Sequence, residues 1–250
     1  MDRPAHGGGG AAPRALLIDL DGTMVDTAPD LAAAAALMLA GLGREPLALA
    51  TVAGFIGDGV PTLVARVLAA AGLAGTADAA AAEASFMRHY AGTNGRHGRA
   101  YPGAPDGVAA LRRAGFPLAC VTNKPQALAE ALLGTCGLLP HFDHVVGGDT
   151  PAGLKPSAGP LLHACRLLGV APQRALMVGD SAIDVAAARA AGMPVWLVRH
   201  GYPGAGADTS SDSATAAGAD GYIDDLGQLA ARLAAPPSHS SHPPLEGIQP

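Results

Sequence analysis

Two aspartates one residue apart come directly after the first apolar run of the chain. In the stretch ALLIDLDGT, Asp19 and Asp21 follow the hydrocarbon side chains of residues 15–18. A carboxylate buried beside hydrocarbon costs free energy unless a cation or hydrogen bonds compensate it. The pair therefore predicts partners from elsewhere in the chain.

Other polar residues capable of chemistry follow later apolar runs. They are Thr122 and Asn123 in ACVTNKP, Lys155 in GLKP, and Asp180 in MVGDSAID with Asp184 one helical turn beyond it. Several carboxylates in a poorly solvated cleft cannot all stay ionised without a cation, so a metal ion is implied. Ligation by oxygen alone favours a hard ion, and few protein ligands leave room for waters and a phosphate, which is how Mg²⁺ is usually held.

This combination of residues suits phosphoryl transfer through a carboxyl-phosphate. Asp19 would attack phosphorus, and Asp21 would protonate the departing oxygen and then take a proton from the attacking water. The Lys155 ammonium can neutralise both Asp19 and an incoming phosphoryl group, and the Thr122 hydroxyl can donate to a phosphoryl oxygen. The predicted partner is a small-molecule phosphate ester.

Short apolar runs alternate with longer stretches rich in Ala and Leu along most of the chain. The runs expected as strands are Ala15–Leu20, Leu118–Thr122, His144–Gly147, Ala175–Gly179 and Val195–Val198. Such alternation predicts a parallel sheet with crossover helices. In these sheets ligands bind beyond the carboxyl ends of the strands, and the polar residues named above stand there.

The segment 26–99 breaks this alternation because its pattern is helical throughout. The expected helices include Asp30–Ala40, Val60–Ala71 and Ala77–Tyr90. We therefore expect an inserted helical cap at 26–99, and an α/β core made of 14–25 and 100–234. Within the cap, Gly57, Asp58 and Gly59 form a short stretch that suits either a loop contacting substrate or a plain turn between helices.

Both ends of the chain are low in complexity. Residues 1–13 are rich in Gly, and residues 235–250 are rich in Pro, Ser and His. Such segments can bury little apolar surface, so we predict that both are disordered. The Ser-, Gly- and Ala-rich stretch Gly204–Gly218 is predicted to be a mobile loop.

Composition narrows the class of protein. The formal charge of −5 and the lack of a Lys/Arg run argue against a nucleic-acid surface. The longest apolar run, Leu31 to Leu42, is too short for a membrane span. Three cysteines without metal-ligand spacing (Cys120, Cys136 and Cys165) suggest reduced thiols and a cytoplasmic protein. We expect a monomer or a homodimer.

Four stretches, in this order, resemble the motifs of haloacid dehalogenase-superfamily phosphatases: DLDGT (19–23), VTN (121–123), LKP (154–156) and GDSAID (179–184). Further stretches, among them YPG (101–103), GGDT (147–150) and HGY (200–202), resemble the bacterial phosphoglycolate phosphatases within that superfamily. The resemblance covers roughly residues 16–229. It implies an α/β fold with a Rossmann-like parallel-sheet core, helices on both faces and an inserted α-helical cap.

The resemblance also implies roles for individual residues. Asp19 would be the nucleophile and a Mg²⁺ ligand, Asp21 the acid and base with its backbone carbonyl on the metal, and Asp180 a metal ligand. Asp184 would be a further ligand or a supporting acid. Thr122 and Lys155 would hold the phosphoryl group with Asn123 beside them, and the loop 57–59 would reach the substrate.

The reaction that the resemblance implies is hydrolysis of 2-phosphoglycolate to glycolate and phosphate. Pyrophosphate or a sugar phosphate would suit the same core, since the residues that would decide lie in the cap. A receiver domain of a response regulator also combines a phosphorylatable Asp, an acid pair, a Thr and a Lys at strand ends. Receivers, however, carry their acceptor Asp on the third strand and have no helical insertion.

Overall fold

The computed structural model describes residues 12–202 and 218–234. The predicted tails, apart from Ala12 and Pro13 at one end, and the predicted loop Gly204–Gly218, apart from its last residue, lie outside the described residues.

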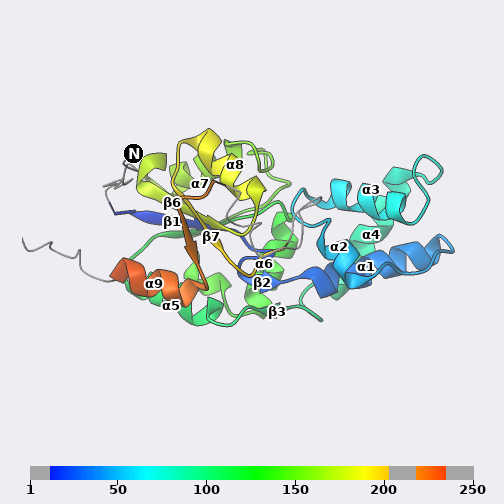
Figure 1. The fold of residues 1–250 in the computed structure, drawn as a ribbon, viewed down its shortest axis with the longest axis horizontal. Helices are drawn as coiled ribbons and strands as arrows, with labels where there is room; N and C mark the ends of the chain where they lie inside the picture. Colours follow the sequence, from blue (N-terminus) through cyan, green and yellow to red (C-terminus); the bar gives the residue numbers. More distant parts are fainter. Residues whose placement is uncertain (1–11, 203–217, 235–250) are drawn as a thin grey trace, which may run out of the picture.

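A parallel sheet forms the core of one of the two parts of the protein seen in Figure 1. The described residues give it six strands in the order β5-β4-β1-β6-β7-β8. The strands are β1 (Ala15–Ile18), β4 (Leu118–Val121), β5 (His144–Val146), β6 (Ala175–Gly179), β7 (Val195–Val198) and β8 (Gly221–Ile223). Every neighbouring pair in this sheet is parallel, which confirms the α/β class predicted from the alternating pattern.

Two predicted strand bounds match the structure and three extend too far. β6 and β7 have the predicted bounds, whereas β1, β4 and β5 end one or two residues earlier than expected. The residues that we placed at the ends of β1 and β4 leave the ladder, since Leu20 and Thr122 stand beyond the last paired positions. The edge strand β8 is absent from our prediction because three residues, GYI, carry too little apolar pattern.

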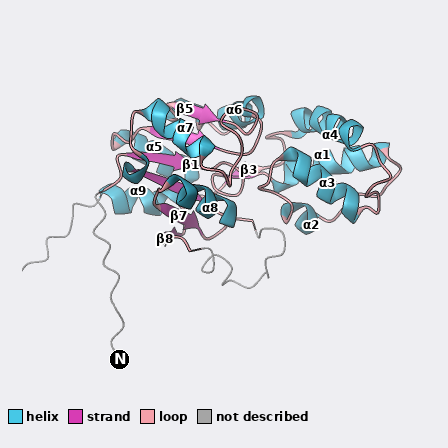
Figure 2. Ribbon diagram, turned by 90° about the horizontal axis from the view of Figure 1, so that it is seen from above, coloured by secondary structure: helices cyan, strands magenta, loops and turns pink. Residues whose placement is uncertain are grey.

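Helices cover both faces of the sheet (Figures 1 and 2). Their bounds are α5 (Ala104–Arg113), α6 (Gln126–Thr135), α7 (Gly159–Leu168), α8 (Ala182–Ala191) and α9 (Leu226–Ala234), with short 3₁₀ turns at Leu139–His141 and Pro172–Arg174. Successive side chains of a strand point to opposite faces, so β1 contributes to two clusters. Leu16 and Ile18 pack with the first, below α5 and α9, and Leu17 packs with the second, below α7 and α8.

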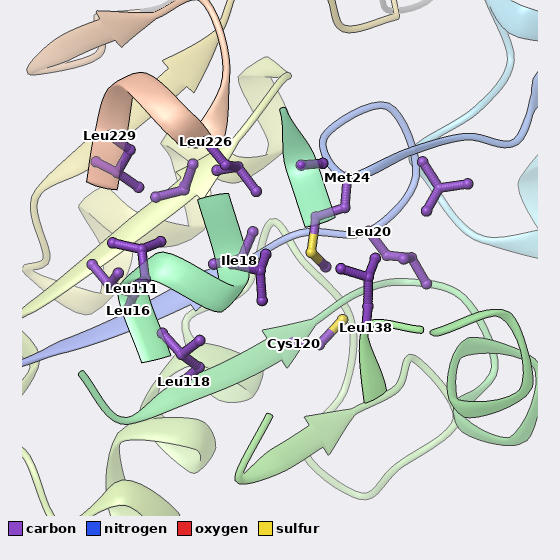
Figure 3. Packing of buried hydrophobic residues seen from close by; sticks show 14 of the residues in the cluster. Leu16, Ile18, Leu20, Met24, Leu111, Leu118, Cys120, Leu138, Leu226 and Leu229 are labelled. Atoms are coloured by element: carbon purple, nitrogen blue, oxygen red, sulfur yellow. The ribbon is translucent and has the colours of Figure 1, made fainter. Parts of the chain in front are cut away.

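The first of these clusters shows how tightly the strand ends are anchored (Figure 3). Leu16, Ile18 and Leu20 belong to one cluster with Leu111 of α5 and with Leu226 and Leu229 of α9, and all six are at most 1% exposed. Because interiors are close-packed, these contacts fix the direction in which the chain leaves β1. The two aspartates that follow are therefore held by a rigid strand end.

A group of four helices stands apart from the sheet (Figure 2). It comprises α1 (Ala28–Gly41), α2 (Leu49–Ala53), α3 (Val60–Ala70) and α4 (Ala79–Thr93). These helices enclose their own apolar cluster, in which Met38, Leu39, Val67, Phe86 and Tyr90 are at most 1% exposed. The pattern predicted three of the four helices, and the five-residue α2 is too short to show a helical period.

The base of this helical group differs from our prediction. We expected helices only between residues 26 and 99, but β2 (Val25–Asp26) and β3 (Arg99–Ala100) form a short antiparallel pair. Two-residue strands have no readable alternation, so the sequence does not indicate them. The pair brings the two chain crossings between the helical group and the sheet side by side.

Candidate active site

The predicted site residues come from neighbouring strand ends. Asp19 follows β1, Thr122 follows β4 and Asp180 follows β6, and β1 lies between the other two strands in the sheet. Lys155 comes from the segment between β5 and α7. The carboxyl ends of parallel strands meet at one edge, and that edge brings these side chains into one cavity.

Lys155 occupies the centre of the charge arrangement. Its Nζ lies 2.9 Å from Asp19 Oδ1 and 2.7 Å from Asp184 Oδ1, and its side chain is 2% exposed. Burial lowers the pKa of Lys155, but the carboxylates of Asp184 and Asp19 outweigh it and raise the pKa above its ordinary value. Lys155 therefore stays charged and neutralises part of the negative charge beside it.

Lys155 compensates only part of the cost of burying the Asp19 carboxyl. Burial raises the pKa of Asp19 to about 7 against the attraction of Lys155, and the charge of Asp184 adds to the rise. Its Oδ1 also accepts a hydrogen bond from the Leu20 backbone nitrogen at 2.7 Å. The pKa of Asp180 is raised as well, by burial and by the carboxylates of Asp184 and Asp19.

Three carboxylates lie close enough to share a cation. Oxygens of Asp19, Asp180 and Asp184 all lie within 4.8 Å of one another. Carboxylates held this close repel strongly, and a hard divalent ion that takes oxygen ligands would relieve the repulsion. The donor set therefore fits a metal of the Mg²⁺ or Ca²⁺ type.

The turn after β1 is shaped to admit Asp180 at this cluster. Gly22 has a φ of +83°, and a Cβ there would overlap the Asp180 carboxylate. Thr23 donates from Oγ1 to Asp180 Oδ1 at 3.1 Å. The glycine and the threonine of DLDGT thus set the approach of a carboxylate that lies 157 positions further along the chain.

Asp184 is the most heavily bonded of the three acids. It is fully buried, and its Oδ1 accepts a hydrogen bond from the Lys155 ammonium. Its Oδ2 accepts from the backbone nitrogens of Asp180 and Ser181, each at 3.2 Å. The Ser181 hydroxyl donates to the same oxygen at 2.8 Å, within a capping box that begins α8. Asp184 thus fixes both Lys155 and the start of this helix.

Thr122 and Asn123 are both buried at the end of β4. The Thr122 hydroxyl accepts from the Lys124 backbone nitrogen at 3.2 Å and lines the cavity. Asn123 Oδ1 accepts from the Lys155 backbone nitrogen at 2.8 Å, and its Nδ2 donates to the carbonyl oxygens of Lys155 and Gly57, each at 2.8 Å. The Asn123 amide therefore holds the Lys155 segment and joins it to the helical group.

The segment 57–59 of the helical group forms one wall of the cavity, whose volume is about 210 Å³. Gly57 and Gly59 have positive φ values, which lets the chain turn sharply into α3. Asp58 Oδ2 pairs with Arg66 Nη1 at 2.6 Å, and both side chains are about one third exposed. The structure brings this loop to the site but pairs Asp58 within its own helical group.

Two buried cavity residues with polar groups, Lys124 and Tyr90, are absent from our sequence-based set. Lys124 Nζ lies 3.1 Å from Asp21 Oδ1 and donates to the hydroxyl of Tyr90, which comes from α4. The position of Lys124 directly after VTN could have indicated it, since the motif already marked the strand end. Nothing in the pattern of α4 distinguishes Tyr90 from an ordinary core aromatic.

Tyr202, in the HGY stretch, joins the site to the helical group. Its backbone nitrogen donates to Asp180 Oδ2 at 2.9 Å, and its hydroxyl accepts from the backbone nitrogens of Thr27 and Ala28. The sequence pointed to this tyrosine only because HGY resembles a stretch of the phosphoglycolate phosphatases. No local pattern reveals a contact across 175 positions.

Within residues 12–202 and 218–234, no helix is long and apolar enough to cross a membrane. Cys120, Cys136 and Cys165 are free, and burial raises the pKa of each thiol.

Comparisons with known proteins agree with this geometry. A family model described as haloacid dehalogenase-like hydrolase matches residues 13–192. A plasmid phosphoglycolate phosphatase of Cupriavidus necator is 56% identical over 219 residues, which cover 88% of this chain and 92% of that protein. The phosphoglycolate phosphatase of Thiobacillus denitrificans is 46% identical over 196 residues, with 76% and 84% of the two chains covered.

Solved structures show the same fold. The crystal structure of a predicted phosphoglycolate phosphatase from Haemophilus somnus 129pt superposes with a TM-score of 0.79 at 27% identity. The alignment covers 87% of this chain and 96% of that one, so the helical group and the sheet both have counterparts there.

Proposed function

The chain belongs to the haloacid dehalogenase-like hydrolases and is a phosphoric monoester hydrolase, and we propose that it hydrolyses 2-phosphoglycolate to glycolate and phosphate through an aspartyl-phosphate. The choice of 2-phosphoglycolate as substrate is supported by the 56% identity to the Cupriavidus necator phosphoglycolate phosphatase over 88% of this chain. Family membership also decides against the receiver-domain alternative.

Asp19 is the proposed nucleophile because it stands at the strand end beside Lys155. An Asp19 oxygen attacks phosphorus, the bond between phosphorus and the ester oxygen breaks, and Asp21 gives its proton to that oxygen. Glycolate leaves, and Asp21 then takes a proton from the water that attacks the aspartyl-phosphate. The second displacement releases phosphate and restores Asp19.

Lys155 and Thr122 would hold the phosphoryl group during both displacements. The Lys155 ammonium already lies 2.9 Å from Asp19, so an oxygen of a phosphoryl group attacked by Asp19 comes within its reach. The Thr122 hydroxyl accepts one backbone hydrogen bond and keeps its own proton to donate. Asn123 supports this arrangement by holding the Lys155 backbone rather than by touching the ester.

Mg²⁺ is the proposed metal, held by the carboxylates of Asp19 and Asp180 and the backbone carbonyl of Asp21. When bound, it would neutralise negative charge on the phosphoryl oxygens and on the surrounding acids. The hydrogen bonds of Asp184 to Lys155 and to the start of α8 favour an orienting role for this residue over direct ligation. Gly57, Asp58 and Gly59 would close the cavity over the substrate.

A panel of phosphate esters tests this proposal. The purified protein with Mg²⁺ should give its highest kcat/KM with 2-phosphoglycolate, against pyrophosphate, a sugar phosphate and p-nitrophenyl phosphate. A higher value for pyrophosphate or for the sugar phosphate would assign the chain to another substrate while leaving the core chemistry intact.

A further inference from the structure

Lys124 is a second buried lysine that the phosphoryl chemistry does not use. Its side chain is 1% exposed, and its Nζ lies 3.1 Å from Asp21 Oδ1. The same ammonium donates to the Tyr90 hydroxyl and stands 4.7 Å from the centre of the Tyr90 ring. Among the described residues these two groups are the hydrogen-bond partners of Nζ, and an ammonium has three protons to donate.

The two lysines serve opposite sides of the reacting bond. Lys155 lies beside Asp19, where phosphorus is attacked, and Lys124 lies beside Asp21, where the leaving oxygen is protonated. Burying an ammonium is costly, and Asp21 alone could be satisfied by a neutral donor. We therefore expect the Lys124 ammonium to have a second anionic partner, on the leaving-group side of the cavity.

The proposed substrate carries such an anionic partner. In 2-phosphoglycolate a single methylene separates the ester oxygen from a carboxylate. When the ester oxygen lies at Asp21, this carboxylate lies close to Asp21 and therefore to the ammonium beside it. Lys124 is the cation at that place, with its Nζ 3.1 Å from Asp21 Oδ1, and a buried ammonium there can pair with the substrate carboxylate.

We propose that Lys124 binds the carboxylate of the leaving group, with Tyr90 of the helical group holding the ammonium in place. The assignment rests on the proposed function. Lys124 would then let the enzyme discriminate between two kinds of phosphate ester of the same size. It would favour esters that carry a carboxylate one carbon away from the ester oxygen over esters with a neutral group there. Because Tyr90 comes from α4, recognition of this carboxylate also joins the helical group to β4.

Arg66 is the rival cation in the cavity, and its surroundings are less suited. Its side chain is 30% exposed, and it already pairs with Asp58 at 2.6 Å. It also donates to the Phe55 carbonyl oxygen at 3.3 Å. A charge that is partly solvated and already neutralised attracts a further anion less than a buried ammonium does.

The test compares 2-phosphoglycolate with ethyl phosphate, in which a methyl group replaces the carboxylate. Lys124→Met keeps an unbranched side chain of nearly the same length and removes its charge. We expect the ratio of kcat/KM for the two esters to fall about 10- to 100-fold, the usual value of a hydrogen bond to a charged group. Most of the loss should appear in KM for 2-phosphoglycolate, and Arg66→Met should change the ratio less than about threefold.

Glycolate binding gives a second measurement that does not need turnover of 2-phosphoglycolate. Glycolate should inhibit hydrolysis of ethyl phosphate by the wild type, and Lys124→Met should lose this inhibition. Tyr90→Phe keeps the ring in the apolar cluster, so it should fold and show an intermediate loss of both the ratio and the inhibition. It decides the question if Lys124→Met does not fold.

Equal losses for both esters in Lys124→Met would overturn the assignment, because Lys124 would then act only on Asp21. A collapse of the ratio in Arg66→Met with no change in Lys124→Met would also overturn it. Failure of the proposed function looks different, because the wild type itself would then show no preference for 2-phosphoglycolate over ethyl phosphate.

Discussion

The backbone nitrogen of Tyr202 donates to Asp180 Oδ2 at 2.9 Å, while the hydroxyl of the same residue donates to Asp26 Oδ1 at 2.7 Å. That hydroxyl also accepts from the backbone nitrogens of Thr27 and Ala28, which begin α1. The first amides of a helix have no partner within the helix, so Tyr202 supplies one. One residue thus connects an acid of the site to the entrance of the helical group.

Tyr202→Phe should weaken this connection without disturbing Asp180, since the backbone nitrogen remains. We expect faster hydrogen exchange at the amides of Thr27 and Ala28, and kcat/KM for 2-phosphoglycolate lower by about fivefold, equal to about 1 kcal/mol for the lost hydrogen bonds. The Mg²⁺ concentration for half-maximal activity should not change. Unchanged exchange at both amides would show that the hydroxyl does not hold the entrance.

The convergence of Asp19, Thr122 and Asp180 could be predicted because strand ends can be read from apolar runs. Asp19, Thr122 and Asp180 each follow a run that ends in the structure within two residues of its predicted position. Parallel topology then requires their convergence at one edge. Lys155 is farther from its strand, and the motif LKP rather than the pattern indicated it.

The contacts between the helical group and the sheet could not be predicted in the same way. Tyr90 and Lys124 are 34 positions apart and meet only because α4 packs over the cavity. Tyr202 meets Thr27 across 175 positions. Local periodicity says which face of a helix is apolar but not which distant residue it meets, so these pairs required the structure.

Asp19→Asn should abolish turnover while the protein stays folded. The amide keeps the shape of the side chain and loses the charge that attacks phosphorus, so we expect kcat to fall at least about a thousandfold. Phosphate release and the thermal unfolding midpoint measure the two effects. Asp19→Ala is the control for traces of deamidated Asn, and substantial activity in the alanine variant would contradict a covalent route through Asp19.

The metal-free protein should lose stability as the pH rises from about 4 to about 7. The pKa of Asp19 is raised from 3.8 to about 7 by burial, so in this range the folded chain binds a proton that the unfolded chain releases. With EDTA present, the midpoint of thermal unfolding should fall more steeply with pH in the wild type than in Asp19→Asn. Parallel curves for the two proteins would show that this carboxyl is not perturbed.

Asp30→Ala should lower the free energy of unfolding more than the loss of an ordinary helical aspartate would. Asp30 is fully buried in the first turn of α1, and its carboxylate accepts from the backbone nitrogens of Gly95, His97 and Gly98. Asp30→Ala leaves these amides without their acceptor, so we expect a loss of about 3 kcal/mol in the free energy of unfolding.

Asp78 gives the matched control for Asp30. It is exposed at the start of α4 and accepts one backbone hydrogen bond, from Ala81 at 3.1 Å. Asp78→Ala should cost only about 1 kcal/mol. Denaturant unfolding of both variants measures the difference, and equal losses would show that burial and the number of hydrogen bonds do not set the value.

Removal of the metal should abolish activity and leave a folded protein. The carboxylates of Asp19, Asp180 and Asp184 lie within 4.8 Å of one another, and Lys155 compensates only part of their charge. EDTA should therefore stop phosphate release, and Mg²⁺ should both restore it and raise the unfolding midpoint because it relieves the repulsion.

Ca²⁺ should raise the midpoint as well but support little turnover, since its larger and looser coordination places the phosphoryl group poorly. Asp180→Asn should need far more Mg²⁺ than the wild type, because one of the carboxylates that would hold the ion is gone. Full activity after exhaustive chelation, or the same Mg²⁺ requirement in Asp180→Asn, would contradict the metal site.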